Sequence, residues 1–297
     1  MIWVTWRQHR AQAIACLGVC CVIAIFAVVM GESMRSAFNS DGLPACLARS
    51  GGAACPAAIT SFVNKFNSPV RALVDIPLFV VPVGVGIMVG GPLLGRELEQ
   101  GTWRLAWSQT VSRTRWLLTK LSLVTGGLVV FGVVVTLLMM WYREPLDRIS
   151  PRLQPPPFNY EGIMFTGSVL CAFGLATLAG LLLRNVIAAI VAGYIAWEVV
   201  SAPILLMSGP LAFPAPLTMR IPCHGACPSG GTNSTVPVTG HLGDLVLNTA
   251  TSGHDLVVTY LPPSRFWTMQ FIGGGLYLVV ASAALGVAIW LLHRRTT

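Results

Sequence analysis

The sequence GRELEQGTWRLAWSQTVSRTRWLLTK occupies residues 95–120 and separates two long apolar runs. It combines charged side chains with three tryptophans and is about as long as a short helical hairpin. Because the neighbouring runs are long enough to cross a membrane, this segment is expected to form a polar, structured surface on one side of it. Such a surface offers a soluble partner a place to bind.

The composition predicts an integral membrane protein. The 297-residue chain is 54% hydrophobic and only 10% charged, and its mean hydropathy is +0.71. Soluble domains carry about 25% charged residues, and each membrane crossing needs about 20 apolar residues. Six runs reach that length, at residues 11–30, 76–94, 121–141, 162–183, 186–207 and 269–292. Helices are preferred because they satisfy their own backbone hydrogen bonds in lipid, and the runs lack the alternation of barrel strands.

The first apolar run has two interpretations. It follows Arg7 and Arg10, as the core of a signal peptide follows a basic segment. It is longer than the usual core of about 7–15 residues, and the residues after it, GESMRSAF, provide no convincing cleavage site. We therefore interpret it as the first membrane helix. Residues 1–10 are expected to form an amphipathic interfacial helix, either an anchor or a lever leading into the six-helix domain of residues 11–297.

The basic residues predict the orientation. Six crossings place both termini on one side, and ten of the 19 basic residues fall in the short segments on that side. The positive-inside rule makes this side cytoplasmic. Only two of the 19 basic residues are lysines, which we interpret as the genome composition of a GC-rich bacterium, so a bacterial plasma membrane is expected. The outer loops are then residues 31–75, 142–161 and 208–265. The positive charge follows the topology and meets lipid phosphates, so no nucleic-acid partner is expected, because such proteins gather basic residues on one folded face.

Short patterns predict parts of the loops. The outer loop around Pro155, Pro156 and Pro157 is expected to be extended. In the third outer loop, strands are expected at residues 245–247 and 256–260. Ser264 is expected to be the N-cap of the last helix.

Two patterns concern how the helices pack. Only Arg184 and Asn185 separate the fourth and fifth runs, which predicts a tight antiparallel hairpin. Gly86 and Gly90 form a GxxxG pair that permits close contact between helices. We favour packing within the chain over a dimer interface for this pair.

The cysteines divide by location. Cys16, Cys20, Cys21 and Cys171 lie in apolar runs, where a thiol behaves as a small apolar group. The other four, Cys46, Cys55, Cys223 and Cys227, lie in outer loops, on the oxidising side.

Three pairings are possible for the four outer cysteines. We favour Cys46 with Cys55 and Cys223 with Cys227, because each pair is close within its own loop. The alternative is a metal held by CHGAC with His224. It lacks the second ligand pair that structural zinc sites use, so no metal is expected.

The chain contains no motif for catalysis of its own. There is no GxxxxGK[ST] phosphate loop and no HExxH, so the chain is not predicted to be an enzyme. Glu198 is the exception inside the membrane, next to Trp197 and one turn before Ser201. A buried acid is costly unless it is paired, and such residues are often functional. We weigh a contact with a cationic substrate, or a gate, against a structural hydrogen bond to a neighbouring helix.

The segment at residues 95–120 resembles the loop between the second and third helices of type 2 ABC exporter permeases. The shared order is an acidic residue, Gly-Thr, an apolar patch, Ser-Arg, and a lysine entering the next helix. These positions are Glu97 and Glu99, Gly101 and Thr102, Leu105, Ser112 and Arg113, and Lys120. The stretches TWRQHR (residues 5–10) and SRFWTMQ (residues 264–270) resemble an actinobacterial, drug- and antibiotic-type branch of this family.

The resemblance implies an all-α permease fold with six transmembrane helices, cytoplasmic termini and a coupling helix in a groove of a separate ABC ATPase. Two permeases, as a homodimer, would work with two ATPases, which bind ATP and magnesium, so the chain itself needs no cofactor. The docking residues would be Glu97, Glu99, Gly101, Thr102, Trp103, Arg104, Trp107, Ser112 and Arg113.

The residues themselves agree with this interpretation of the segment. Gly101 can end the extension of the second helix, and Ser112 can cap the third. Trp103 and Trp107 share one helix face.

The expected function is export of a hydrophobic or amphipathic compound such as an antibiotic, drug, peptide or lipid. Trp197, Glu198 and Ser201 are candidates for the substrate pathway. The alternative is a membrane immunity or sensor protein that binds a ligand through its outer loops.

Overall fold

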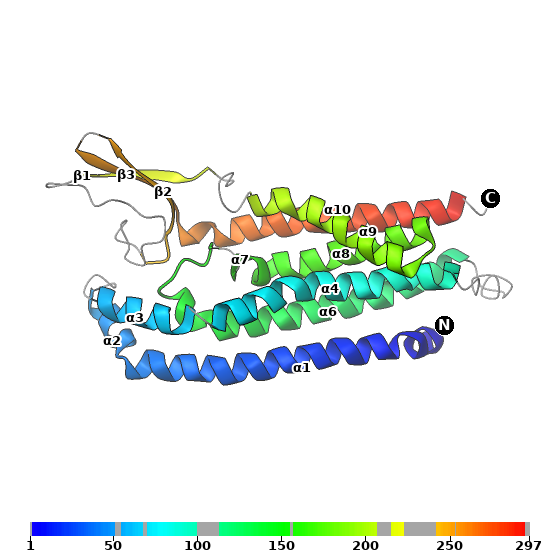
Figure 1. Ribbon diagram of the computed structural model, residues 1–297, viewed down its shortest axis with the longest axis horizontal. Coiled ribbons are helices and arrows are strands. Elements are labelled where there is room, and N and C mark those ends of the chain that lie inside the picture. Colours follow the sequence, from blue (N-terminus) through cyan, green and yellow to red (C-terminus); the bar gives the residue numbers. More distant parts are fainter. Residues whose placement is uncertain are drawn as a thin grey trace.

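Figure 1 shows the computed structural model, an elongated bundle of helices with a small β-sheet at one end. The structure describes residues 2–50, 55–67, 70–99, 113–154, 157–206, 215–222, 242–252 and 254–294. The start of the first helix and the end of the last are both at the end of the bundle opposite the sheet (Figure 1). We call these two ends of the bundle the sheet end and the terminus end.

Five helices are long and apolar enough to cross a membrane among the described residues. They are α1 (Ile2–Ser40), α6 (Arg113–Asp147), α8 (Gly162–Leu183), α9 (Val186–Leu206) and α10 (Phe266–Arg294). The predicted crossing at residues 76–94 lies within a further long helix, α4 (Val70–Glu99). Only part of the side chains of α4 belong to the described residues, so a sixth crossing stays a prediction.

Two of these helices are longer than a membrane requires. The 39 residues of α1 and the 35 of α6 span about 58 and 52 Å at 1.5 Å per residue, whereas the hydrocarbon core is about 30 Å thick. Both helices therefore continue toward the sheet end, beyond the apolar runs at residues 11–30 and 121–141. Two short helices, α2 (Leu43–Ser50) and α3 (Pro56–Asn67), follow α1 there. The segment expected as an outer loop is thus largely helical.

Helix α8 is the centre of the bundle. It packs against α4, α6, α9 and α10, and about two thirds of it is buried. Gly86 and Gly90 of α4 lie against α8 so closely that an added Cβ would come within 2.5 Å of backbone oxygens of Val169 and Phe173. The GxxxG pair therefore packs within the chain, as predicted.

The predicted hairpin between α8 and α9 is confirmed. Helix α8 ends at Leu183 and α9 begins at Val186. Arg184 reverses the chain with a left-handed backbone, at φ 52°. Its N–H donates to the carbonyl of Gly180, which closes the last turn of α8. Helix α8 therefore ends, and α9 begins, at a turn of fixed geometry.

The sheet has three antiparallel strands in the order β1–β3–β2. They are β1 (Leu217–Pro222), β2 (Leu245–Ser252) and β3 (Asp255–Leu261). The two predicted strands are confirmed, and β1 was not expected. The central strand β3 buries Leu256, Val258 and Leu261.

Two local predictions are wrong. Ser264 does not cap α10: it lies inside a 3-10 turn, η1 (Pro263–Arg265), whose N-cap is Pro262. Proline is favoured in the first turn of a helix because its missing N–H is not needed there, and Pro263 fills that place. Pro157 is likewise not extended but begins the short helix α7 (Pro157–Tyr160), while residues 155–156 lie outside the described part of the chain.

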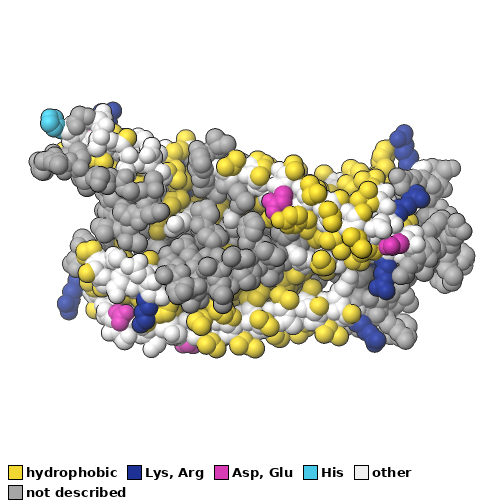
Figure 2. Space-filling model, viewed as in Figure 1, with side chains coloured by type: hydrophobic (Ala, Val, Ile, Leu, Met, Phe, Trp, Pro, Cys, Tyr) yellow, Lys and Arg dark blue, Asp and Glu magenta, His cyan; other side chains and the backbone are white. Residues whose placement is uncertain are grey.

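The bundle keeps a broad apolar surface. Figure 2 shows hydrophobic side chains along the length of the helices, with Lys and Arg side chains toward both ends. Many large apolar side chains are exposed, among them Ile14 and Leu17 of α1 and Ile187 and Val199 of α9. An apolar band between charged ends is the surface that a lipid bilayer stabilises.

Candidate functional site

The segment at residues 95–120 is flanked by the end of one long helix and the start of another, and we call these two helix ends its base. Helix α4 ends at Glu99 and α6 begins at Arg113, and the tip between them, residues 100–112, lies outside the described part of the chain. Most of the predicted docking residues fall on this tip: Gly101, Thr102, Trp103, Arg104, Trp107 and Ser112. The side chains of Glu97 and Arg113 also lie outside the described residues.

Lys120 fastens α6 to α4 at this base. Its ammonium group donates a hydrogen bond to the carbonyl oxygen of Leu93 at 3.3 Å, and the residue is only 3% exposed. It also lies 5.2 Å from the centre of the Trp116 ring, a cation–π contact that helps to hold a desolvated charge. A buried ammonium is costly without such partners. The two helix ends that flank the tip are therefore held together.

Glu99 connects the same base to a different helix. Its Oε2 accepts a hydrogen bond from the backbone N–H of Val186 at 3.2 Å, at the start of α9. Asn185 is the N-cap of α9, and its Oδ1 accepts from the N–H of Ala188 at 2.9 Å. Carboxylates are favourable at helix N-termini because the free N–H groups there carry partial positive charge. The Glu99 carboxylate, expected to face the ATPase, is thus engaged within the chain.

A second polar cluster lies inside the apolar band, among α8, α9 and α10. The indole N–H of Trp197 donates to the hydroxyl of Ser168 at 3.1 Å. The hydroxyl of Tyr277 is hydrogen-bonded to both Ser168 and Ser201. All four residues are buried, and polar groups in an apolar interior need such partners. Trp197 and Ser201 therefore join three helices.

Glu198 lies on a different face of α9 from these two residues. It is only half-buried, and the hydroxyl of Tyr194, one turn earlier, is hydrogen-bonded to it. Tyr194 is 49% exposed and Val199 is 69% exposed, so the carboxylate lies at an apolar surface. The three residues predicted for a substrate pathway are therefore divided: Trp197 and Ser201 face the interior, and Glu198 faces outward.

Sequence reasoning missed a group of four charged residues at the sheet end. Arg143 lies 3.0 Å from Glu161 and 3.5 Å from Asp147, and Arg152 lies 3.1 Å from Glu161 and 3.2 Å from Asp147. Each guanidinium thus contacts both carboxylates. We call these four residues the charge ring. It joins the end of α6 to the start of α8.

The charge ring is largely removed from solvent. The side chains of Glu161 and Arg143 are 0% and 7% exposed. Burial, followed by the carboxylate of Asp147, raises the pKa of Glu161 to about 7, against the opposing effect of the two guanidinium groups. Arg143 also donates to the hydroxyl of Tyr160 at 3.4 Å. When both carboxyl groups are ionised, the ring holds two charges of each sign and is neutral as a whole.

Gln270 completes the start of α8 next to the ring. Glu161 is the N-cap of α8 but makes no capping bond with its side chain, which the ring occupies. The buried Gln270 of α10 accepts instead from the N–H of Met164 at 3.0 Å and donates to the carbonyl of Phe158 at 2.7 Å. Its side chain also lies against Gly162, where φ is +65°. Helices α7, α8 and α10 are thus connected by one side chain.

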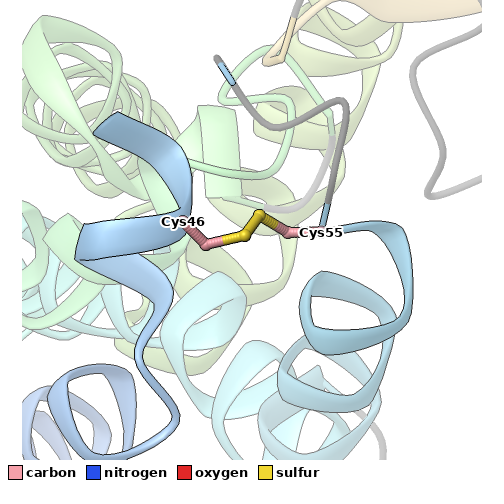
Figure 3. Close-up of a disulfide and its surroundings, with 2 residues drawn as sticks. All are labelled: Cys46 and Cys55. Carbon is pink, nitrogen blue, oxygen red and sulfur yellow. A yellow bond between two sulfur atoms is a disulfide. The ribbon is translucent and has the colours of Figure 1, made fainter. Parts of the chain in front are cut away.

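The sheet end also contains a disulfide. Figure 3 shows Cys46 of α2 joined to Cys55, the residue before α3, with 6.3 Å between their Cα atoms. This is one of the two expected pairs; Cys223, His224 and Cys227 lie outside the described residues. The four cysteines in the apolar runs are free, as expected. Within the described ranges, no group of three potential metal ligands occurs.

Comparison with protein families adds to this geometry. Residues 17–207, more than half of the chain, match the family described as ABC-2 membrane transporter related. The comparisons with curated proteins and with solved structures give no match. The matched region runs from α1 to the end of α9 and includes both ends of the segment at residues 95–120. The chain therefore belongs to the ABC-2 membrane transporter related family, as the multi-pass membrane component of an ABC transporter that works with a separate ATPase subunit.

Proposed function

We propose that the chain is the permease subunit of an ATP-driven exporter in the bacterial plasma membrane. The main support is that the two helix ends that flank the segment at residues 95–120 are held to each other and to α9. Lys120 holds α6 to α4, and Glu99 holds α4 to α9. A charged, tryptophan-bearing tip on such a base can transmit force. The chain has no phosphate loop of its own, so the force comes from the partner ATPase.

In this proposal the tip is a coupling helix with both termini on the same, cytoplasmic side. Glu97 presents its charge to the ATPase, with Arg104 and Arg113 on either side of the Trp103 and Trp107 face. Gly101 gives the turn a backbone that a Cβ would disfavour. When the ATPases close on ATP, the tip moves and carries its base with it.

Two copies of the chain are proposed to enclose the pathway. The exposed apolar faces of α1 and α9 leave surface for a second permease. The Glu198–Tyr194 pair on α9 would then face the pathway. A carboxylate beside an aromatic ring is suited to a cation, so an amphipathic cation is the proposed type of substrate. Mass measurement in native-like lipid is expected to give two permeases with two ATPases, and an active 1:1 complex would refute the pairing.

The main test is reconstitution with an ABC ATPase, taken first from the genes that neighbour the permease gene. Wild-type protein should co-purify with that ATPase and move substrate in liposomes when ATP is added. Glu97→Lys or Gly101→Val should leave expression and insertion intact but release the ATPase or uncouple hydrolysis from transport. Charge reversal at an interface costs several kcal/mol when like charges meet, which a pull-down can detect.

Arg148→Glu is the matched control for this test. Arg148 lies beyond α6 at the sheet end and is 59% exposed, far from the tip along the helix. It should change neither association nor coupling. Normal transport in Glu97→Lys and Gly101→Val, together with loss of transport in Arg148→Glu, would contradict both the orientation and the docking site.

An alternative function is favoured by the folded sheet end. The disulfide, the three-stranded sheet and the charge ring build more structure there than a simple connection requires. A membrane immunity or sensor protein would use this structure to bind a ligand. Ligand binding and biological activity that persist when the ATPase is deleted would support this alternative over export.

A further inference from the structure

One contact joins the base of the segment at residues 95–120 to a helix far away in sequence. The Glu99 carboxylate accepts from the N–H of Val186, 87 positions later. Val186 is the first residue of α9, and the N–H groups of a first turn have no partner within their own helix. Asn185 satisfies the N–H of Ala188, which leaves the N–H of Val186 for Glu99.

The helices around this contact are closely packed. An added Cβ on Gly95 of α4 would lie 3.6 Å from Gly180 and 3.7 Å from Val186 at their Cα atoms. An added Cβ on Gly180 would come within 2.7 Å of the carbonyl oxygen of Gly91. The end of α4 therefore packs directly on the turn between α8 and α9. A displacement of α4 there reaches α9 without being absorbed by flexible side chains.

Helix α9 connects this contact with the polar residues in the apolar band. Glu198 lies 12 residues after Val186, about 18 Å along the helix at 1.5 Å per residue. The same helix contains Trp197 and Ser201, which contact α8 and α10. A shift at the start of α9 therefore moves Glu198 relative to these helices.

We propose that Glu99 is a positioning residue that transmits movement of the segment at residues 95–120 to α9. This rests on the proposed function, because the movement comes from the ATPase. Lys120 is buried and fixes α4 to α6, whereas the Glu99 contact is exposed and can break and re-form. Glu99 thus adds a breakable polar contact to the packing of α4 on the start of α9, while Lys120 keeps the base intact.

The test uses the full permease–ATPase complex with Glu99→Ala, Glu99→Gln and, as a matched loss of an exposed acid, Glu144→Ala. Losing an exposed charge at a helix N-terminus corresponds to about a two- to fivefold change. Hydrogen exchange of the peptide that contains Val186, measured on the permease alone, should quicken by about that factor in Glu99→Ala. Substrate moved per ATP hydrolysed should fall by a similar factor, while the ATPase still co-purifies.

Glu99→Gln keeps an acceptor oxygen, so its exchange rate at Val186 and its transport per ATP should be closer to the wild type than those of Glu99→Ala. General destabilisation would not produce this difference. Glu144→Ala should change neither. Faster exchange at Val186 with unchanged transport per ATP would overturn the transmitting role. Unchanged exchange at Val186 in Glu99→Ala would overturn the contact itself. If wild-type permease binds no ATPase, the proposed function fails and the transmitting role fails with it, whereas the exchange result still reports on the contact.

Discussion

Replacing Arg143 with glutamine removes one of the two cations from the charge ring at the sheet end of the bundle. Glu161 and Asp147 then share Arg152 alone. Arg143 lies 3.0 Å from Glu161, and their side chains are 7% and 0% exposed, so water cannot replace the lost contact. The variant keeps a hydrogen-bond donor and much of the side-chain volume, so the change is chiefly one of charge.

The expected loss of stability is large at pH 8. Breaking a buried ion pair by removing one partner costs about 3–5 kcal/mol, because the other charge remains buried and uncompensated. For a chain of this size, with about 2 °C of midpoint per kcal/mol, the unfolding midpoint should fall by at least about 6 °C. The measurement is thermal unfolding of the purified permease in lipid nanodiscs.

The loss should be smaller at pH 6. In the wild type, burial raises the pKa of Glu161 to about 7, with Arg143 among the groups that oppose the rise. Without Arg143 the pKa rises further, so Glu161 is protonated at pH 6 and its uncompensated charge disappears. The folded variant then binds more protons than the unfolded chain, so its stability falls as the pH rises from 6 to 8.

Arg148→Gln is the matched control for this experiment. Arg148 is 59% exposed and pairs with Glu144, which is 42% exposed. Exposed pairs of this kind contribute about 0–1 kcal/mol, so its midpoint should move by about 2 °C or less. Equal shifts in the two variants, or a loss in Arg143→Gln that is as large at pH 6 as at pH 8, would refute the role assigned to the ring.

Three further predictions concern the rest of the structure. The wild type should become less stable as the pH rises from about 4.5 to about 7, because the pKa of Glu161 is higher in the folded state than its ordinary value; a flat series of midpoints contradicts this. Gly90→Ala should lower the free energy of unfolding by about 1–3 kcal/mol through overpacking, because its Cβ would lie 2.5 Å from a backbone oxygen of α8. Gly126→Ala has open space around it and should be neutral or stabilising by up to about 1 kcal/mol. Comparing the unfolding midpoints of the two variants tests this. Peptide mapping without reduction should find Cys46 joined to Cys55, a closed loop that contributes about 2–3 kcal/mol, so reductant should lower the midpoint of the wild type more than that of a Cys46→Ser variant.

The fold could be predicted where one physical requirement left a single solution. A run such as residues 162–183 has to be helical in lipid, since no other backbone geometry satisfies its own hydrogen bonds there, and α8 occupies these same residues. The spacing and small size of Gly86 and Gly90 predicted a close contact between helices. The strands at residues 245–247 and 256–260 were readable from their short apolar patterns.

The sheet end of the bundle was harder to predict because its helices contain no apolar run long enough to cross a membrane. Helices α2 and α3 are short, and the sheet-end extensions of α1 and α6 lie beyond the apolar runs at residues 11–30 and 121–141, so periodicity gave no strong signal there. Strand β1 has mostly exposed side chains, and it exists because β3 offers an edge with which to pair. Pairing between strands distant in sequence depends on the whole chain.

The sequence by itself determined that the chain is a membrane protein, which of its segments are apolar, and that residues 95–120 form its distinctive polar insert, because lipid solubility and helix length act on each segment separately. Only the tertiary structure decided which charges meet. Arg143 and Asp147 are one turn apart and could be paired by spacing, but Arg152 and Glu161 join them only because the connection between α6 and α8 folds back onto the end of α6. Likewise Glu99 reaches the start of α9 only because α4 packs on the turn between α8 and α9. Contacts between residues far apart in sequence arise from packing, and no local pattern records them.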